Sequence, residues 1–449
     1  MIDIKRKIFK QNSRDFLIQK NIVLSFFVKG WSVAVQLLLV PLTLACLGIY
    51  ENGVWLTISS VLLWIDNLDV GLGNGLRNKL ATYIAEENIL KAREMVSSTL
   101  AMLIIIIIPT LAILVVTESY ANLYVFFNVS PQRIDNLVQI TIVATIMVCA
   151  TFILKFLGNF YMGLQLPAIN NGLVTIGNTL ALIGTYIVYL SGFHSLLLIA
   201  IVNTAGPLMS YLLCYPITFY GKYKNLRPSI KFVNSSSVKE LFLIGAKFFV
   251  LQIAGIILFF STNIIISKLY SPSMVTPYQI ANRYFMVAML LFTIICVPYW
   301  SATTDAYAKN DIKWIKRSNK TLNYFMLFIF ALITLMIIVS PFIYNIWIGK
   351  KAIIPLPVTI LVGLYQFVLI FSTRYSYVLN GLGKLKLQLY VTVSVAIAYI
   401  PLALLVTHNN ANINALLILM SVINIPGLLI NAIQYKKVIS GTAQGIWTK

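Results

Sequence analysis

Charged side chains, and acidic ones above all, are scarce in this chain. Only 13 of its 449 residues are Asp or Glu. Charged residues together make up 10% of the chain, whereas ordinary soluble domains carry about 25%. Hydrophobic residues make up 59%, and the mean hydropathy is +0.86. No soluble core requires so much apolar sequence, so the composition predicts an all-α protein that crosses a membrane many times.

Residues that bind metals or form disulfides are also few. The only histidines, His194 and His408, fall in short predicted loops with no carboxylate cluster beside them. The four cysteines lie in four separate apolar runs and form no C-x-x-C pair. We therefore expect no metal, no cofactor and no enzymatic activity.

Long apolar runs dominate what is present. About twenty apolar residues cross a bilayer as one helix, and the sequence predicts about twelve such spans. The approximate spans are Asn21–Leu47, Gly53–Asp69, Met95–Val116, Leu137–Phe160, Gly172–Leu190, Leu196–Phe219, Leu241–Ile266, Thr276–Trp300, Tyr324–Ile346, Ile353–Tyr377, Leu389–Val406 and Ala415–Ile433. The predicted loops are short, so no soluble domain is attached.

The basic residues are distributed unevenly between these spans. Of the 34 Lys and Arg residues, 25 fall on the side that holds both termini, four on the opposite side and five within spans. This asymmetry places both termini in the cytoplasm. It also explains the formal charge of +21 without nucleic acid as a partner.

The two halves of the chain look related. Lys29 and Lys247 stand near the starts of spans 1 and 7, 218 residues apart, and Lys155 and Arg374 are separated by 219 residues. A shared offset favours two pseudo-symmetric six-helix lobes, residues 1–220 and 221–449, an arrangement of repeats that many transporters use.

Five basic residues lie inside predicted spans: Lys29, Lys155, Lys247, Arg283 and Arg374. A charge at the centre of a membrane helix is opposed by roughly 2.5–3.5 kcal/mol, so such residues usually face a protein-lined or watery cavity. An excess of intramembrane cations predicts a pathway for an anionic group. The alternative for each residue is that its long side chain reaches the interface and leaves only its stem in lipid.

Only Asp66 and Asp69 supply acids at comparable depth. They are candidates for ion coupling, or else they cap the following helix or pair with Arg77. Trp31 is unusually deep in its span, and it either stacks on a sugar or serves in helix packing.

Several segments resemble the Wzx-type O-antigen flippases, a branch of the multidrug/oligosaccharidyl-lipid/polysaccharide exporter superfamily. These segments are KG at 29–30, VPL at 40–42, GVW at 53–55, DVGLGNGLRNKL at 69–80, GAKFF at 245–249, VTPYQI at 275–280 and NGLGK at 380–384.

The resemblance implies two lobes around a central cavity, and a flippase that moves oligosaccharides linked to undecaprenyl pyrophosphate across the bacterial cytoplasmic membrane. It implies that Lys29, Lys247 and Arg283 face the cavity and bind the pyrophosphate, with Lys155 and Arg374 as further candidates. Membrane lipids, a polysaccharide polymerase and a chain-length regulator would be its natural partners.

Three other functions remain open. A drug exporter of the same superfamily should carry buried acids, and a peptidoglycan-precursor flippase should have fourteen spans. A membrane polysaccharide polymerase or ligase should have a large external loop.

Overall fold

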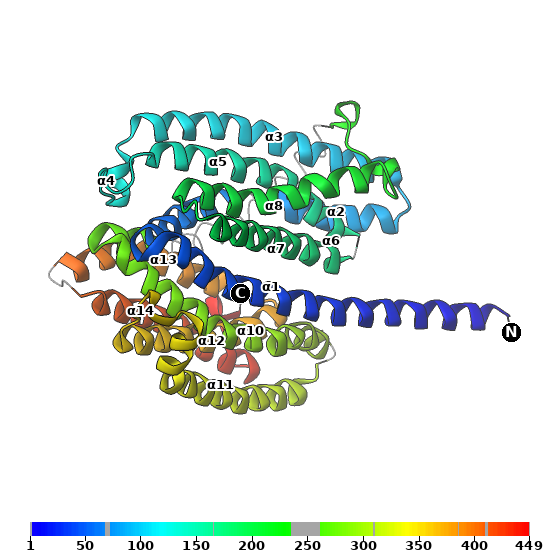
Figure 1. Cartoon of the computed structure of the whole chain (residues 1–449). Helices are drawn as coiled ribbons and strands as arrows, with labels where there is room; N and C mark the ends of the chain where they lie inside the picture. Colours follow the sequence, from blue (N-terminus) through cyan, green and yellow to red (C-terminus); the bar gives the residue numbers. More distant parts are fainter. Residues whose placement is uncertain are drawn as a thin grey trace. The chain divides into compact units, whose positions relative to one another are not determined.

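A computed structural model describes residues 2–67, 72–164, 166–234, 261–308, 310–384, 386–408 and 412–448. Every regular element in these ranges is helical (Figure 1). The α-helices are α1 (Ile2–Asn67), α2 (Leu72–Ala85), α3 (Ile89–Tyr120), α4 (Leu123–Phe127), α5 (Leu137–Leu154), α6 (Phe156–Gly163), α7 (Pro167–Ser191), α8 (Leu196–Phe219), α10 (Pro272–Ala308), α11 (Ile312–Trp347), α12 (Leu356–Gly381), α13 (Lys386–His408) and α14 (Asn414–Ile439). Residues 261–269 are also helical. The short 3-10 helices are η1 (Lys224–Leu226), η2 (Ile230–Phe232), η3 (Gly349–Lys351) and η4 (Gly445–Thr448).

Ten helices in the described ranges are long and apolar enough to cross a membrane. The first of them, Gly30–Ile65, covers two of the expected spans, which meet at a kink at Gly48. The expected seventh span, Leu241–Ile266, falls mostly outside the described residues. The predicted class, an all-α multi-pass membrane protein, is confirmed.

Large apolar side chains on the outside of α3 show why lipid must surround it. Ile105 is 62% exposed and Ile113 is 66% exposed. The most apolar 18-residue segment of α3 has a mean hydropathy of 3.0. Water would penalise such a surface, whereas lipid does not. A helix suits this position because it satisfies its backbone hydrogen bonds within itself.

The contacts divide the chain into two units. Unit 1 comprises Met1–Leu47 and Leu62–Gln252, and unit 2 comprises Gly48–Val61 and Ile253–Lys449. A segment of α1 therefore belongs to the second unit, although both its neighbours in sequence belong to the first. The expected lobes, residues 1–220 and 221–449, remain a prediction.

In unit 1, α7 packs closely against α8, and α5 lies beside both α3 and α8 (Figure 1). Glycines permit the α7–α8 approach. A Cβ atom added to Gly177 would lie 2.7 Å from the Cα of Pro207, and one added to Gly206 would lie 2.5 Å from the carbonyl oxygen of Gly177. Small residues at such a crossing allow van der Waals contact between backbones, which drives association of helices in lipid.

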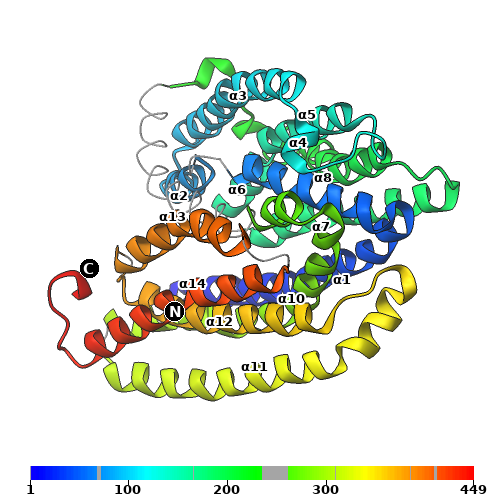
Figure 2. The same cartoon turned by 90° about the vertical axis from the view of Figure 1, so that its left-hand side faces the viewer.

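In unit 2, α12 packs against both α10 and α14 (Figure 2). The α1 segment of this unit is fixed to α10 by polar contacts. Asn52 donates from its side-chain amide to Thr276 Oγ1 at 3.2 Å, and that hydroxyl donates to the carbonyl of Ile49 at 2.8 Å. A Cβ atom on Gly53 would lie 1.8 Å from the carbonyl oxygen of Pro272, so only glycine permits this packing.

Candidate functional site

Polar side chains gather around one stretch of α10 inside unit 2. We call four of them the amide cluster: Asn263, Gln279, Asn282 and Gln366. Gln279 donates to the side-chain oxygen of Asn263 at 2.7 Å, and Gln366 donates to that of Asn282 at 2.7 Å. Asn263 in turn donates to the carbonyl of Leu56 at 3.2 Å. These bonds join α10 to α12, to the helix at 261–269 and to the α1 segment of unit 2.

Arg283 follows Asn282 directly and lies on the adjoining face of α10, where it is half-buried. Its guanidinium offers a planar set of donors that matches the oxygens of a phosphate, and the nearby amides are uncharged hydrogen-bonding groups. A cation beside neutral hydrogen-bonding groups can attract an anion. The geometry therefore suits an anionic ligand.

Arg374, on α12, is completely buried. One of its terminal nitrogens donates to the backbone carbonyl of Asn319 at 3.1 Å and also to the Asn319 side-chain oxygen. Its guanidinium lies 4.3 Å from the centre of the Tyr375 ring. Arg374 is thus held within unit 2 by α11 and by its own neighbour, and the structure gives it no exposed surface.

The structure places Arg283 and Arg374 in the same helix pair but at different levels. Asn282 bonds to Gln366, and Arg374 follows Gln366 by eight residues along α12. Eight residues correspond to roughly 12 Å along the helix axis. The two arginines therefore do not form one cluster.

Lys155 and Trp31 belong to unit 1. Lys155 is half-buried at the junction of α5 and α6, where its backbone N–H donates to the carbonyl of Thr151 at 2.8 Å. Trp31 donates from Nε1 to Thr179 Oγ1 on α7 at 3.2 Å, which is a packing contact. Trp31 is still 51% exposed.

Four predicted site residues lie outside the described part. These are the side chains of Lys29 and Asp66, and all of Lys247 and Asp69. The pair of lysines near the starts of spans 1 and 7, and the two candidate coupling carboxylates, therefore remain predictions.

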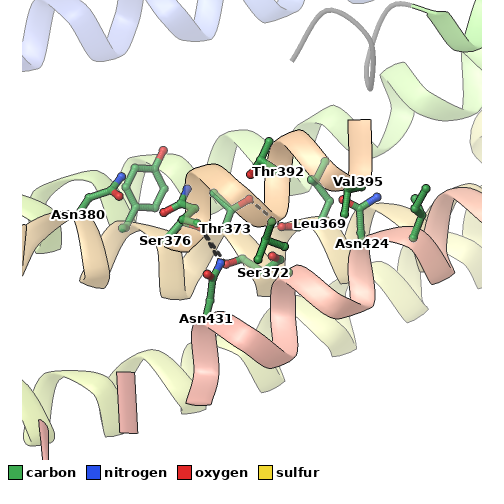
Figure 3. Close-up of a pocket in the computed structure, with 14 residues that line it drawn as sticks. Leu369, Ser372, Thr373, Ser376, Asn380, Thr392, Val395, Asn424 and Asn431 are labelled. Atoms are coloured by element: carbon green, nitrogen blue, oxygen red, sulfur yellow. Dashed lines mark hydrogen bonds between the residues drawn. The ribbon is translucent and has the colours of Figure 1, made fainter. Parts of the chain in front are cut away.

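Besides the amide cluster, two further polar features were not predicted from the sequence. Glu118, near the end of α3, accepts a hydrogen bond from Thr145 Oγ1 of α5 at 2.7 Å. The second feature is a cavity of about 300 Å³ among α12, α13 and α14 (Figure 3). Its polar residues are uncharged, so the pattern of intramembrane charges in the sequence does not reveal it. The available signal was their spacing, which is four residues along α12 and seven residues along α14.

Metal-binding side chains do not gather in the described part of the chain, where no group of three or more His, Cys, Asp or Glu residues could hold an ion. Besides the carboxylate of Glu118, the polar groups that the structure brings together are amides, hydroxyls and arginines. Such groups can bind and orient a ligand.

Comparison with known proteins gives a consistent picture. Residues 249–405 match the MatE family model. A protein of Yersinia pseudotuberculosis named as a candidate O-antigen export protein is 21% identical over 365 residues, which cover 79% of this chain and 81% of that protein.

Solved structures extend the likeness to almost the whole chain. An inward-facing multidrug resistance MATE family transporter of the MOP superfamily has a TM-score of 0.77 at 14% identity, over 94% of this chain and 100% of that one. A MOP superfamily transporter from Pyrococcus furiosus, described as having a binding pocket of reverse polarity, has a TM-score of 0.61 at 14% identity, over 95% of each chain. This chain is therefore a multi-pass membrane protein that carries a MatE match and has the two-lobe fold of the MOP superfamily transporters.

Proposed function

We propose that this protein is a flippase that moves undecaprenyl-pyrophosphate-linked oligosaccharides from the cytoplasmic to the external leaflet of a bacterial cytoplasmic membrane. The observation that carries the proposal is a basic residue inside the α10 span of unit 2: Arg283 stands beside the amide cluster. Intramembrane ionisable residues generally mark a functional site such as a substrate pathway, and a basic residue there favours an anionic cargo.

The chemistry of the cargo agrees with this set of residues. A pyrophosphate needs cationic donors to replace its hydration, and a glycan needs neutral hydrogen-bonding groups. Release on the far side requires that binding be moderate, which several separate contacts achieve better than one tight site. The named O-antigen export relative is consistent with such a cargo.

The proposed mechanism is alternating access. The pyrophosphate is attracted by basic side chains. These include Arg283 and, as the sequence predicts, Lys29 and Lys247. The polyprenyl tail remains in lipid throughout, so moving it between leaflets adds no free-energy cost of transfer into water. A conformational change then exposes the headgroup outside, and both termini stay in the cytoplasm.

The experiment that tests the proposal uses a strain that lacks this gene. We expect undecaprenyl-pyrophosphate oligosaccharide to accumulate on the cytoplasmic leaflet while surface polysaccharide disappears, and the wild-type gene to reverse both effects. If repeat units reach the outer leaflet unjoined, the protein is a polymerase. If neither pool changes, it exports a different cargo, such as a drug.

The same strain tests the arginine directly. We expect the Arg283→Gln variant to fail to restore surface polysaccharide, because the amide keeps the size and polarity but not the charge. The matched control is Lys350→Gln, which removes the same charge from an exposed position in η3. Equal rescue by both variants, at equal membrane abundance, would contradict a role for Arg283.

A further inference from the structure

The cavity among α12, α13 and α14 has an unusual lining for a space inside a membrane protein. Nine of its fourteen lining residues are polar, and none is charged. Its volume of about 300 Å³ matches the smaller of the pockets that hold small molecules. Such pockets are normally lined mostly by apolar residues, so the excess of polar groups requires a reason.

The polar residues reach the cavity because they repeat at helical spacing. On α12 they are Ser372, Ser376 and Asn380, each four residues from the last. On α14, Asn424 and Asn431 are seven residues apart with Gly427 between them. Residues three, four and seven apart lie on one helix face. Two polar faces therefore meet, with Thr392 of α13 beside them (Figure 3).

Asn431 shows that the two polar faces do not satisfy all of each other's hydrogen-bonding groups. The residue is only 3% exposed, and its side-chain nitrogen donates to Ser376 Oγ at 3.2 Å (Figure 3). Its side-chain oxygen is buried and has no hydrogen-bond partner among the described residues, and the same is true of the side-chain oxygens of Asn380 and Gln388. A buried acceptor without a donor costs about 1–3 kcal/mol. Three such acceptors around one cavity call for a ligand that donates hydrogen bonds.

The lining also restricts the chemistry of that ligand. A phosphate would need basic groups, and an organic cation would be favoured by carboxylates, but neither kind of residue lines the cavity. A neutral molecule rich in hydroxyl groups fits, because each hydroxyl both donates and accepts, as do the Ser, Thr, Asn and Gln side chains. Asn380 and Gln388 flank the α12–α13 connection, which the charge distribution places on the cytoplasmic side.

We propose that this cavity is a subsite for uncharged sugar residues of the transported glycan, separate from the basic residues that bind the pyrophosphate. The inference rests on the proposed function, since it names the part of the same cargo that this cavity recognises. The hydroxyl groups of the sugar satisfy the acceptors of Asn380, Gln388 and Asn431, and water takes their place when the cavity is empty.

The test measures protection of a single cysteine in the purified full-length protein. The four native cysteines are replaced, Thr392→Cys introduces a thiol into the cavity wall, and labelling by a water-soluble thiol reagent is timed. The probes are neutral oligosaccharides, sugar-free undecaprenyl pyrophosphate and sodium chloride. Ser440→Cys, exposed beyond the end of α14, is the matched control.

We expect a neutral oligosaccharide to slow labelling of Thr392→Cys and not of Ser440→Cys. At about ten times the apparent Kd, labelling should slow about ten-fold, because mass action leaves about a tenth of the cavities empty. Protection by sodium alone, or by sugar-free undecaprenyl pyrophosphate, would overturn the sugar assignment. So would the absence of protection by every oligosaccharide.

A filled cavity supplies the second arm. A Cβ atom on Gly427 would lie 3.5 Å from Ser372 Oγ, an ordinary contact, so Gly427→Leu directs its side chain into the space. We expect this variant to lose sugar protection. Gly172→Leu, where an added Cβ meets nothing within 4 Å, is the control for the same change in another helix. Retained protection in Gly427→Leu would overturn the proposed location.

These outcomes are separable from failure of the proposed function. If the deletion strain accumulates lipid-linked oligosaccharide but no sugar protects Thr392→Cys, the flippase proposal stands and the subsite is wrong. If sugars protect the thiol and the deletion changes neither lipid pool, the cavity binds sugar but the cargo assignment is wrong.

Discussion

At the scale of single residues, Arg374 illustrates how a membrane protein holds a buried charge without an acid. Its guanidinium is bonded to two oxygens of Asn319 and lies against the ring of Tyr375. Two of its three nitrogens, Nε and Nη1, have no partner among the described residues. The guanidinium is thus both desolvated and incompletely hydrogen-bonded. Its stability in this position depends strongly on Asn319.

This dependence gives a prediction. Asn319→Leu should lower stability by about 1.5–3 kcal/mol, the usual worth of hydrogen bonds to a charged group. Arg374→Met should be close to neutral, because it removes the charge together with its desolvation cost and keeps the volume. Thermal unfolding of the purified variants in detergent checks both values.

The double variant Asn319→Leu/Arg374→Met is the control, since it should recover stability relative to Asn319→Leu alone. A larger loss in Arg374→Met than in Asn319→Leu would mean that the charge itself stabilises the fold.

At the scale of elements, α1 depends on two glycines that serve different purposes. Gly48 has φ 67° and ψ −178°, a conformation that is essentially restricted to glycine, and it marks the kink at which the chain passes from unit 1 to unit 2. Gly53 is required by space, because the carbonyl of Pro272 occupies the position of a Cβ atom. One position is limited by the backbone and the other by packing.

Gly48→Ala should therefore destabilise the protein by about 1–3 kcal/mol through backbone strain alone. An added Cβ at Gly48 meets nothing within 4 Å, so no steric clash contributes. Gly172→Ala is the matched control in an α-helical position with open space, and it should stabilise by up to about 1 kcal/mol. Melting temperatures of the two variants measure the difference. Equal stability would show that the kink relaxes to another conformation.

Gly53→Ala should be destabilising for a different reason. The new methyl group must push the α1 segment away from α10, and overpacking of this kind costs about 1–3 kcal/mol or more. The displaced segment should also lose the bond between Asn52 and Thr276. A Gly53→Ala/Asn52→Ala double variant checks this, because the second change should then cost almost nothing. Full additivity of the two losses would contradict the displacement.

At the scale of the whole molecule, the distribution of charge predicts how the chain is oriented in the membrane. The imbalance of 25 basic residues on one side against four on the other predicts that both termini are cytoplasmic. Exposed positions are available on both predicted sides, Gln132 in the loop before α5 and Ser440 after α14.

Single-cysteine variants at these positions report the orientation. An impermeant thiol reagent applied to intact spheroplasts should label Gln132→Cys at once and Ser440→Cys only after permeabilisation. The four native cysteines are replaced in both variants, so that the labelling belongs to the new residue. The reverse pattern would place the termini outside and invert the proposed direction of transport.

The sequence by itself determined the fold class, the approximate span boundaries and the expected orientation of this protein. Those properties depend on apolar length and on the placement of basic residues, which are local and additive along the chain. The boundary between the first two spans was also predicted, although the structure joins them into the single helix α1 with a kink at Gly48.

Only the tertiary structure decided which polar groups meet. Asn282 and Gln366 lie 84 residues apart and bond only because α10 and α12 pack together. The depth of Arg374 in its span made it a candidate for binding an anionic group, whereas its burial against Asn319 depends on the packing of α11. The cavity lined by Asn431 required three helices at once. Hydrogen bonding between distant segments depends on register and distance after packing, and neither quantity is encoded in hydropathy or charge.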